Sequence, residues 1–301
     1  MTRREFSFSA VAAAATAGAP SSPWTMSVES YIFTQYAERQ KKTLAEIVPQ
    51  MLSDVRKAGF RNIELNPQFL APDLRDRVLQ GLREYGLMMP SVYVGGPLHT
   101  QAGSEKTITQ ALEIAEVCRP FGCVGLVNNP DPKANKARKT DTELAFEAQA
   151  LNRMGQALRE RGVELRVHHH TPQLEENARE WRYILQDTLP NLVSLCVDVD
   201  WAYQGGFDPV PFLREAGPRV KELHIRSERN KLWLEQVQDS EIDYRAVAQY
   251  LKEENLQPLL VVELAWMPNT VITRSLEEDL RLSRLYTESV FAPAPSHARL
   301  P

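Results

Sequence analysis

The sequence predicts an α/β protein with a single domain, an eight-stranded parallel (β/α)8 TIM barrel. From about residue 29 onward, short β-branched or apolar runs alternate with longer amphipathic stretches, and no Pro/Gly/Ser-rich linker divides them. Strands that are separated by helices cannot pair as hairpins, so the sheet should be parallel. Eight such units in roughly 260 residues match a closed barrel better than an open sheet.

The runs that predict strands are short and rich in β-branched, aromatic or apolar residues. The eight predicted strands are residues 31–34, 62–65, 91–94, 124–127, 165–170, 194–199, 222–225 and 259–264. Between them, apolar residues recur at helical spacing. The predicted helices include residues 43–57, 108–117, 143–161, 176–185, 244–254 and 276–286. Gly59, Gly86 and Gly162 precede three of the strands, and glycine is the residue that most readily ends a helix.

An open, doubly wound parallel sheet is the alternative architecture. Such a sheet would usually show a glycine-rich phosphate loop after its first strand. At that point the chain reads Thr34-Gln35-Tyr36-Ala37 and has no glycine. The closed barrel is therefore the stronger interpretation.

The first 22 residues differ in character from the rest of the chain. Arg3 and Arg4 precede an Ala-rich, weakly apolar run at 8–19, and small residues at 17–19 suit a signal peptidase. We therefore predict a twin-arginine signal peptide at 1–22 and export to the periplasm, followed by a barrel at 26–290 and a C-terminal tail at 291–301. The run is shorter than the about 20 apolar residues that span a bilayer, so no stable membrane anchor is expected. An Ala-rich terminus with two chance arginines is the alternative.

Composition narrows the range of partners. The formal net charge is −4, the pI is near 5.9 and no stripe of clustered Lys and Arg occurs, so a nucleic acid is not an expected partner. The three cysteines are odd in number and lie in or near predicted helices and strands, which favours packing roles over a disulfide framework. The sequence leaves a homo-oligomer open.

Polar side chains gather at the carboxyl ends of the predicted strands, where the chemistry of a (β/α) barrel takes place. Five of the six histidines lie at or just after such an end, and only His297 lies in the tail. Asp198, His224 and Glu263 stand on three successive strands. Imidazole and carboxylate groups bind Mn, Co, Mg or Zn, and no thiolate stands at these positions. The sequence therefore predicts a divalent metal ion at this end of the barrel.

Alternation along each strand indicates which of these groups enter the barrel, because every second side chain points inward. On the fifth strand, His168 and His170 face the barrel and His169 faces the helices if the polar set points inward, whereas a bulge would reverse this orientation. A single carboxylate at a strand end is more often the N-cap of the next helix than a ligand. The coincidence of three such groups on successive strands is what favours a site.

At these residues the chain resembles the xylose isomerase-like barrel superfamily, over about residues 29–290. The most specific segments are Cys196-Val197-Asp198-Val199-Asp200-Trp201-Ala202, Gly206-Phe207-Asp208-Pro209 and Arg219-Val220-Lys221-Glu222-Leu223-His224-Ile225-Arg226. The resemblance implies metal ligands at Asp198, His224 and Glu263. The fourth ligand is normally a carboxylate near the fifth strand. Here that strand ends in a triplet that looks like a His-x-His version, which assigns His168 to the metal, and Gln173 stands where a Glu often follows.

The superfamily includes sugar-phosphate isomerases and epimerases, so the resemblance implies a metal-dependent sugar isomerase or epimerase with a small sugar or keto-sugar substrate. These reactions remove a proton next to a carbonyl, and a divalent ion that chelates the carbonyl and a hydroxyl stabilises the enediolate. We expect Glu263 to act as ligand and base and His170 to be a catalytic imidazole. Arg226 is expected to hold a hydroxyl, a carboxylate or a phosphate.

Other polar and aromatic residues are expected to bind the sugar. Glu64, counted among the catalytic residues, and His99 should contact sugar hydroxyls, while Trp201 and Trp266 offer flat apolar faces to a ring. The same site could eliminate water or a glycosidic leaving group β to a ketone, as a dehydratase or a 3-keto-glycoside lyase. A non-catalytic carbohydrate-binding barrel is the second alternative.

Overall fold

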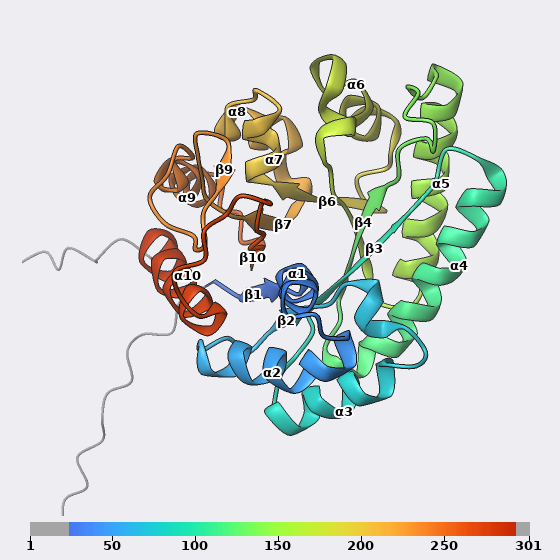
Figure 1. Ribbon diagram of the computed structural model, residues 1–301. Helices are drawn as coiled ribbons and strands as arrows, with labels where there is room; N and C mark the ends of the chain where they lie inside the picture. Colours follow the sequence, from blue (N-terminus) through green and yellow to red (C-terminus); the bar gives the residue numbers. More distant parts are fainter. Residues whose placement is uncertain (1–23, 293–301) are drawn as a thin grey trace, which may run out of the picture.

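Eight parallel strands form the centre of the molecule, and helices surround them (Figure 1). The computed structural model describes residues 24–292, so the predicted signal peptide at 1–22 and the predicted tail beyond residue 292 lie outside the described residues. The barrel strands are β1 (Met26–Glu29), β2 (Ile63–Glu64), β3 (Ser91–Gly96), β4 (Gly125–Pro130), β5 (Glu164–Val167), β6 (Val193–Asp198), β7 (Val220–Ile225) and β10 (Leu259–Val262).

The strands are arranged in the order β2-β1-β10-β7-β6-β5-β4-β3, and each neighbouring pair is parallel. Two isolated parallel bridges, from Asn62 to Met88 and from Leu65 to Val92, connect the segments that carry the two end strands. The sheet is therefore a nearly closed barrel, and the predicted (β/α)8 TIM barrel is confirmed.

The helices are α1 (Tyr31–Gln40), α2 (Leu44–Lys57), α3 (Arg75–Tyr85), α4 (Gln101–Cys118), α5 (Asp141–Arg159), α6 (Thr171–Asp187), α7 (Val199–Gln204), α8 (Pro209–Ala216), α9 (Tyr244–Glu253) and α10 (Leu276–Phe291). Capping boxes fix the start of two of them. Thr43 caps α2 with Glu46, and Thr140 caps α5 with Glu143, so that side chains satisfy backbone N–H groups of the first turn. Between residues 24 and 292, no helix combines the length and the apolar character needed to cross a membrane.

The first predicted strand, at residues 31–34, is wrong. These residues begin helix α1, and the strand lies just before them at Met26–Glu29. The aromatic and β-branched run Tyr-Ile-Phe-Thr has the composition of a strand, but Ile32, Phe33 and Ala37 are the buried positions, which is helical spacing. The true strand is only four residues long and half polar, so its pattern is weak.

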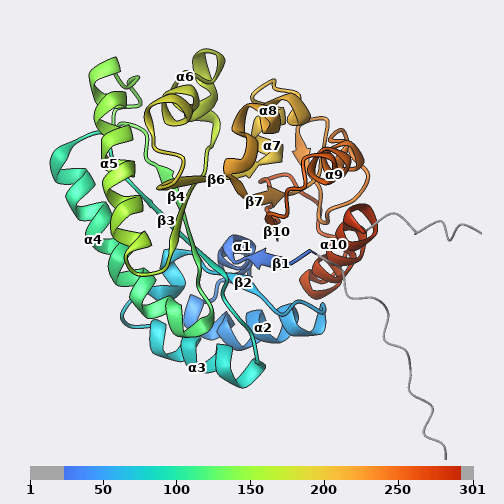
Figure 2. The ribbon, with the colours of Figure 1, turned by 180° about the vertical axis from the view of Figure 1, so that it is seen from behind.

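The start and the end of the described chain pack together. Trp24 contacts Phe291 edge-on, with ring centroids 5.8 Å apart, and Figure 2 shows α10 beside the start of β1. Helix α10 ends at Phe291, one residue past the predicted barrel boundary at 290. This contact ties the last helix to the first strand and helps to complete the ring of helices.

The barrel interior contains a network of buried polar groups. The hydroxyl of Ser91 on β3 is within hydrogen-bond distance of Glu222 on β7, at 2.9 Å, and of Glu64 on β2, and Arg166 on β5 donates to Glu222 at 2.8 Å. Because β3 and β7 are not neighbours in the sheet, the contact between Ser91 and Glu222 crosses the barrel. Buried charges need such partners, since isolated ones would be strongly destabilising.

One antiparallel pair stands outside the barrel. Strands β8 (Glu228–Arg229) and β9 (Leu232–Trp233) form a short hairpin between β7 and α9. Its two turn residues, Asn230 and Lys231, have φ of 52° and 61°, as in the tight hairpin turns that match the twist of the strands. No pattern in the sequence predicted this hairpin, which places Trp233 beside Arg226.

Candidate metal centre and substrate cavity

Four predicted metal ligands meet at the carboxyl end of the barrel. Asp198 ends β6 and lies in register with His224 on β7, while His168 and Glu263 directly follow β5 and β10. One possible ligand atom from each residue lies within 4.8 Å of the others. The barrel therefore brings together groups that are far apart in sequence, as the strand-end pattern predicted.

His224 is held between carboxylates. Its Nδ1 lies 2.7 Å from Oε2 of Glu263, and its Nε2 lies 3.1 Å from Oε1 of Glu64 and 3.7 Å from Oε1 of Glu222. Burial alone would lower the pKa of His224, but its acidic neighbours, Cys196 and Glu64 among them, outweigh burial and raise it. The ring is thus fixed in position from both sides.

The two carboxylates of the cluster are ionised. Burial acts to raise the pKa of Asp198, but Arg226 and His168 outweigh it and hold that pKa well below its ordinary value. Burial is likewise outweighed at Glu263, where Arg226 and His224 lower the pKa. Anionic oxygens at this position suit a divalent cation.

His168 supplies the observation that tests the fit of a metal. It is fully buried, and burial lowers its pKa, so its ring is neutral and has a lone pair to offer. Its Nδ1 lies 3.4 Å from Oδ1 of Asn129, while its Nε2 lies 3.7 Å from Oδ2 of Asp198 and has no hydrogen-bond partner among residues 24–292. Two imidazoles and two carboxylates, one of them beside an unpartnered ring nitrogen, fit a divalent ion such as Mn, Co, Mg or Zn.

His224 also belongs to two other groups of close donors. One pairs it with His168 and Cys196, and the other with Glu64 and Glu222. The group with Asp198 and Glu263 presents two donors to a cavity, His224 and Glu263, whereas the other two groups present His224 alone. We therefore take that group as the candidate metal centre.

The cavity at the barrel mouth has a volume of about 550 Å³. The predicted residues His170, Arg226 and Trp201 line it with Glu263 and His224. This volume lies within the range of cavities that bind small molecules, and its walls combine aromatic rings with a few charged groups. The arrangement suits a sugar-sized ligand.

Arg226 joins the cavity to the candidate metal centre. Its Nη2 donates to Oδ2 of Asp198 at 2.5 Å and lies 2.7 Å from Oε1 of Glu263. The guanidinium carbon also lies 5.5 Å from the ring centre of Trp201 and 4.8 Å from that of Trp233. The side chain is therefore fixed, with its charge shared between two carboxylates and two rings.

A family described as the xylose isomerase-like TIM barrel matches residues 52–285, which span most of the barrel and all four donors. The chain belongs to the xylose isomerase-like TIM barrel family. The inosose dehydratase of Geobacillus kaustophilus is 28% identical over 210 residues, which cover 65% of this chain and 67% of that protein.

Solved structures share the fold of this xylose isomerase-like barrel. A sugar phosphate isomerase/epimerase from Parabacteroides distasonis aligns with a TM-score of 0.71 at 18% identity, over 94% of this chain and 99% of that chain. An L-ribulose 3-epimerase aligns with a TM-score of 0.71 at 14% identity, over 89% of this chain and 94% of that chain. At these identities the likeness shows the fold alone.

Three predicted sugar-binding residues of this xylose isomerase-like barrel lie away from the cavity. Glu64 is fully buried beneath it, with Ser91 and His224 as neighbours, so its depth in the barrel does not suit contact with sugar hydroxyls. Trp266 stacks with Arg39 and lines a separate cavity. His99 is not among the cavity residues either, and its nearest charged groups include Lys139.

His169 has the orientation that alternation predicted. Its ring packs edge-on against Trp181 of α6 and Phe212 of α8, with centroid distances of 4.7 and 5.3 Å. It therefore faces the helices, whereas His168 and His170 face the barrel mouth.

Several cavity residues of this xylose isomerase-like barrel were not predicted from the sequence, among them Glu29 and Trp233. Glu29 lies at the end of β1, which was placed five residues too late, and Trp233 lies on the unpredicted hairpin. The indole Nε1 of Trp233 donates to Oδ2 of Asp200 at 2.9 Å, which fixes the ring over Arg226. Alternating polarity in residues 26–29 is the only sequence signal that could have found Glu29.

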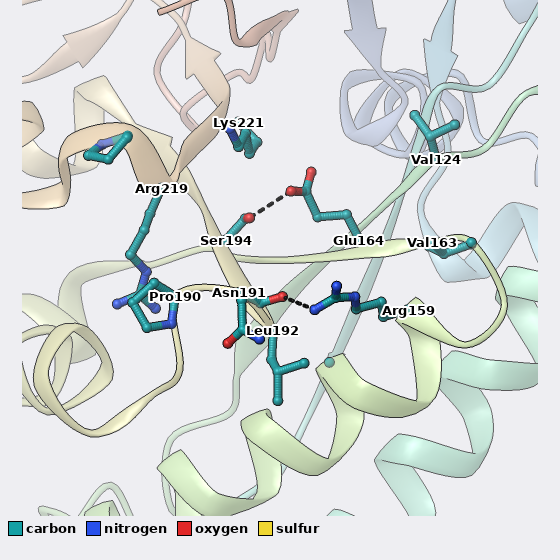
Figure 3. A pocket seen from close by; sticks show the side chains of 13 residues that line it. Val124, Arg159, Val163, Glu164, Pro190, Asn191, Leu192, Ser194, Arg219 and Lys221 are labelled. Atoms are coloured by element: carbon teal, nitrogen blue, oxygen red, sulfur yellow. Dashed lines mark hydrogen bonds between the residues drawn. The ribbon is translucent and has the colours of Figure 1, made fainter.

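A second cavity, of about 420 Å³, lies at the opposite end of strands β5, β6 and β7 (Figure 3). Several of its polar groups have partners: Ser194 donates to Glu164 at 2.7 Å, and Arg159 donates to the carbonyl of Asn191 at 3.1 Å. Arg219 donates to two backbone carbonyls and to Thr188. At the amino end of a barrel such groups serve stability, so the cavity at the carboxyl end is the candidate reaction site.

Proposed function

We propose that the protein is a metal-dependent sugar isomerase or epimerase that removes a proton from the carbon next to a carbonyl. The proposal depends on one observation, the convergence of His168, Asp198, His224 and Glu263 within 4.8 Å at the edge of the cavity. When bound there, a divalent ion such as Mn, Co, Mg or Zn would polarise the carbonyl and a neighbouring hydroxyl and stabilise the enediolate.

The side chains around the centre provide the remaining chemistry. Glu263 lines the cavity as a carboxylate and can accept the proton from carbon. Arg226, held between two indole rings, can donate hydrogen bonds to a substrate oxygen. Burial lowers the pKa of His170 to about 3, so its neutral ring can both donate to and accept from a hydroxyl.

Dehydration is the second candidate reaction. It begins with the same proton removal and continues with loss of a hydroxyl group β to the carbonyl. The likeness to the inosose dehydratase of Geobacillus kaustophilus, at 28% identity, favours it, and a 3-keto-glycoside lyase would use the same step with a glycosidic leaving group. In either case the proposed substrate is a small keto sugar or cyclic keto polyol.

We also propose that the protein acts outside the cytoplasm. Support comes from Arg3 and Arg4 and from the Ala-rich run at 8–19, which have the pattern of a twin-arginine signal. The export route for folded proteins is consistent with a centre that receives its ion before transport.

The function can be tested with purified protein loaded with Mn, Co, Mg or Zn and incubated in D2O with L-ribulose, inosose and a 3-keto-glucoside. An isomerase or epimerase should add deuterium next to the carbonyl and form an isomer, as seen by NMR. A dehydratase or lyase should release water or the aglycone. The proposal fails if no metal form promotes deuterium exchange or conversion of any of these keto compounds.

A further inference from the structure

Glu29 is a cavity carboxyl that does not belong to the group of four donors. It ends β1, which lies between β2 and β10 in the barrel. Glu29 pairs in register with Glu64 of β2, and Val28 pairs with Val262 of β10, so Glu29 stands level with Glu263. Two carboxyl-bearing side chains, Glu29 and Glu263, are thus presented to the cavity from adjacent strands.

The two oxygens of Glu29 have different surroundings. Oε2 accepts a hydrogen bond from the backbone N–H of Tyr31 at 2.6 Å, which fixes the side chain. Oε1 is buried and has no hydrogen-bond partner in the part of the chain that the structure describes, although only 2% of the residue is exposed. An unpartnered buried carboxyl oxygen destabilises a fold, so its presence on a cavity wall indicates that a ligand supplies the partner.

Two other polar residues of the cavity are held by their neighbours. Arg226 is paired with Asp198 and Glu263, and His170 packs edge-on against Trp201 and His168. Of the acidic residues described along the cavity wall, Glu29 is the one with an oxygen free to meet a substrate.

We propose that Glu29 is the second proton-transfer residue of this site and acts through Oε1. This inference rests on the proposed function. In epimerisation, Glu263 takes the proton from carbon, and Glu29 returns one to carbon, with its O–H bond breaking as the new C–H bond forms. In dehydration, Glu29 gives its proton to the departing hydroxyl, which leaves as water. Glu29 then regains a proton from solvent and Glu263 releases one, so no oxidant or reductant is needed.

Glu29→Gln is the direct test. Glutamine keeps the size of the side chain and an oxygen for the N–H of Tyr31, but it cannot transfer a proton. In the Mn-loaded protein we expect kcat to fall by about 10²–10⁴-fold with little change in KM, which is the range for loss of a general acid or base. Deuterium should still enter the recovered keto sugar, because Glu263 continues to remove and return its proton.

Two measurements separate this inference from other roles of Glu29. Calorimetric titration with Mn²⁺ should give the same affinity for Glu29→Gln as for the parent, and circular dichroism should show the same fold. Glu164→Gln is the matched control, since Glu164 is a strand residue in the opposite cavity, and it should leave kcat unchanged. If Glu29→Gln does not fold, Glu29→Asp is the second variant. It keeps the acid but shortens the side chain, so its kcat should fall by less than the roughly 10²–10⁴-fold expected for loss of the acid.

Three results would overturn the inference. Unchanged kcat in Glu29→Gln would remove Glu29 from proton transfer. Loss of Mn²⁺ binding in that variant would make it a metal ligand instead. A parent protein that converts none of the keto compounds would refute the proposed function and the inference with it. An active parent with an equally active variant would refute the inference alone.

Discussion

Nδ1 of His224 lies 2.7 Å from Oε2 of Glu263, although the two residues are 39 positions apart in the chain. Neighbouring strands β7 and β10 bring them together, and Oε1 of Glu64 lies 3.1 Å from the other ring nitrogen. A carboxylate at one ring nitrogen fixes the orientation of a histidine, as is usual for metal-binding imidazoles, in which the other nitrogen binds the ion. The surroundings of His224 raise its pKa and a metal binds only the neutral ring, so binding of an ion here should become tighter as pH rises.

Asp198→Asn should weaken binding of Mn²⁺ by at least about 10-fold while the fold is retained. Asparagine keeps an oxygen for the N–H of Trp201 at the start of α7, so the helix cap survives, but it lacks the negative charge. Isothermal titration calorimetry measures the affinity. Asp208→Asn, at the corresponding cap of α8, is the control and should bind Mn²⁺ as the parent does. Equal affinity in both variants would remove Asp198 from the metal centre.

Arg226→Gln should reduce turnover of the keto sugar by about 100-fold or more, because a donor to the developing oxyanion is lost. Its effect on the metal should be opposite to that of Asp198→Asn. Without the cation 2.5 Å from Asp198 and 2.7 Å from Glu263, the two carboxylates should bind Mn²⁺ at least as tightly. Weaker Mn²⁺ binding in this variant would contradict the charge argument. Thermal unfolding measures the same effect: addition of Mn²⁺ should raise the Tm of Arg226→Gln at least as much as it raises the Tm of the parent.

Lys139→Met should destabilise the metal-free protein by about 3–5 kcal/mol, since it leaves two buried carboxylates without their cation. Lys139 Nζ lies 2.6 Å from Glu147 and 2.9 Å from Glu180, and its side chain is only 3% exposed. Urea unfolding measures the loss. Lys133→Met, which removes a partner of the more exposed Glu143, should cost about 1 kcal/mol or less. Equal losses in the two variants would show that burial of the cluster does not matter.

The raised pKa of Asp279 should make the free energy of unfolding fall as pH rises from about 4 to 6. Burial raises the pKa of Asp279 to about 6, although Arg274 donates to it at 2.7 Å. The folded protein then retains a proton that the unfolded chain releases above its ordinary pKa of about 3.9, so the stabilisation is complete at low pH and is lost as pH passes 6. In Asp279→Asn the free energy of unfolding should vary less with pH over this interval. Urea unfolding of the parent and of Asp279→Asn at pH 4, 5, 6 and 7 measures this dependence. If the free energy of unfolding varies equally with pH in the two proteins, the prediction is refuted.

Replacement of Arg3 and Arg4 by Lys should stop export, because the twin-arginine route requires the arginine pair. Cell fractionation and immunoblotting of the parent and the double variant measure the outcome. The same exchange at Arg75 and Arg77 on α3 should leave export intact. Unchanged export of the variant with Lys at positions 3 and 4 would refute the twin-arginine assignment.

The sequence allowed prediction of the convergent donors but not of every residue around the cavity. Asp198, His224 and Glu263 end strands with clear apolar patterns, and in a parallel barrel all such ends meet at one face. Glu29 was missed because the four residues of β1 give a weaker strand signal than the aromatic run that follows. The position of Trp233 depends on its hydrogen bond to Asp200, 33 residues away, which no local pattern encodes. Its place at the end of a predicted strand suggested that Glu64 contacts sugar hydroxyls, but a strand pattern could not give its depth in the barrel.

The β8–β9 hairpin has a consequence for protein engineering. Within the described chain its strands pair only with each other, so a change in its length or sequence leaves the register of the barrel strands unaffected. It nevertheless contributes Trp233 to the cavity wall. Transplanting this ribbon between related barrels is therefore a modular way to change the wall of the cavity, while the candidate metal donors at the ends of β5, β6, β7 and β10 keep their places.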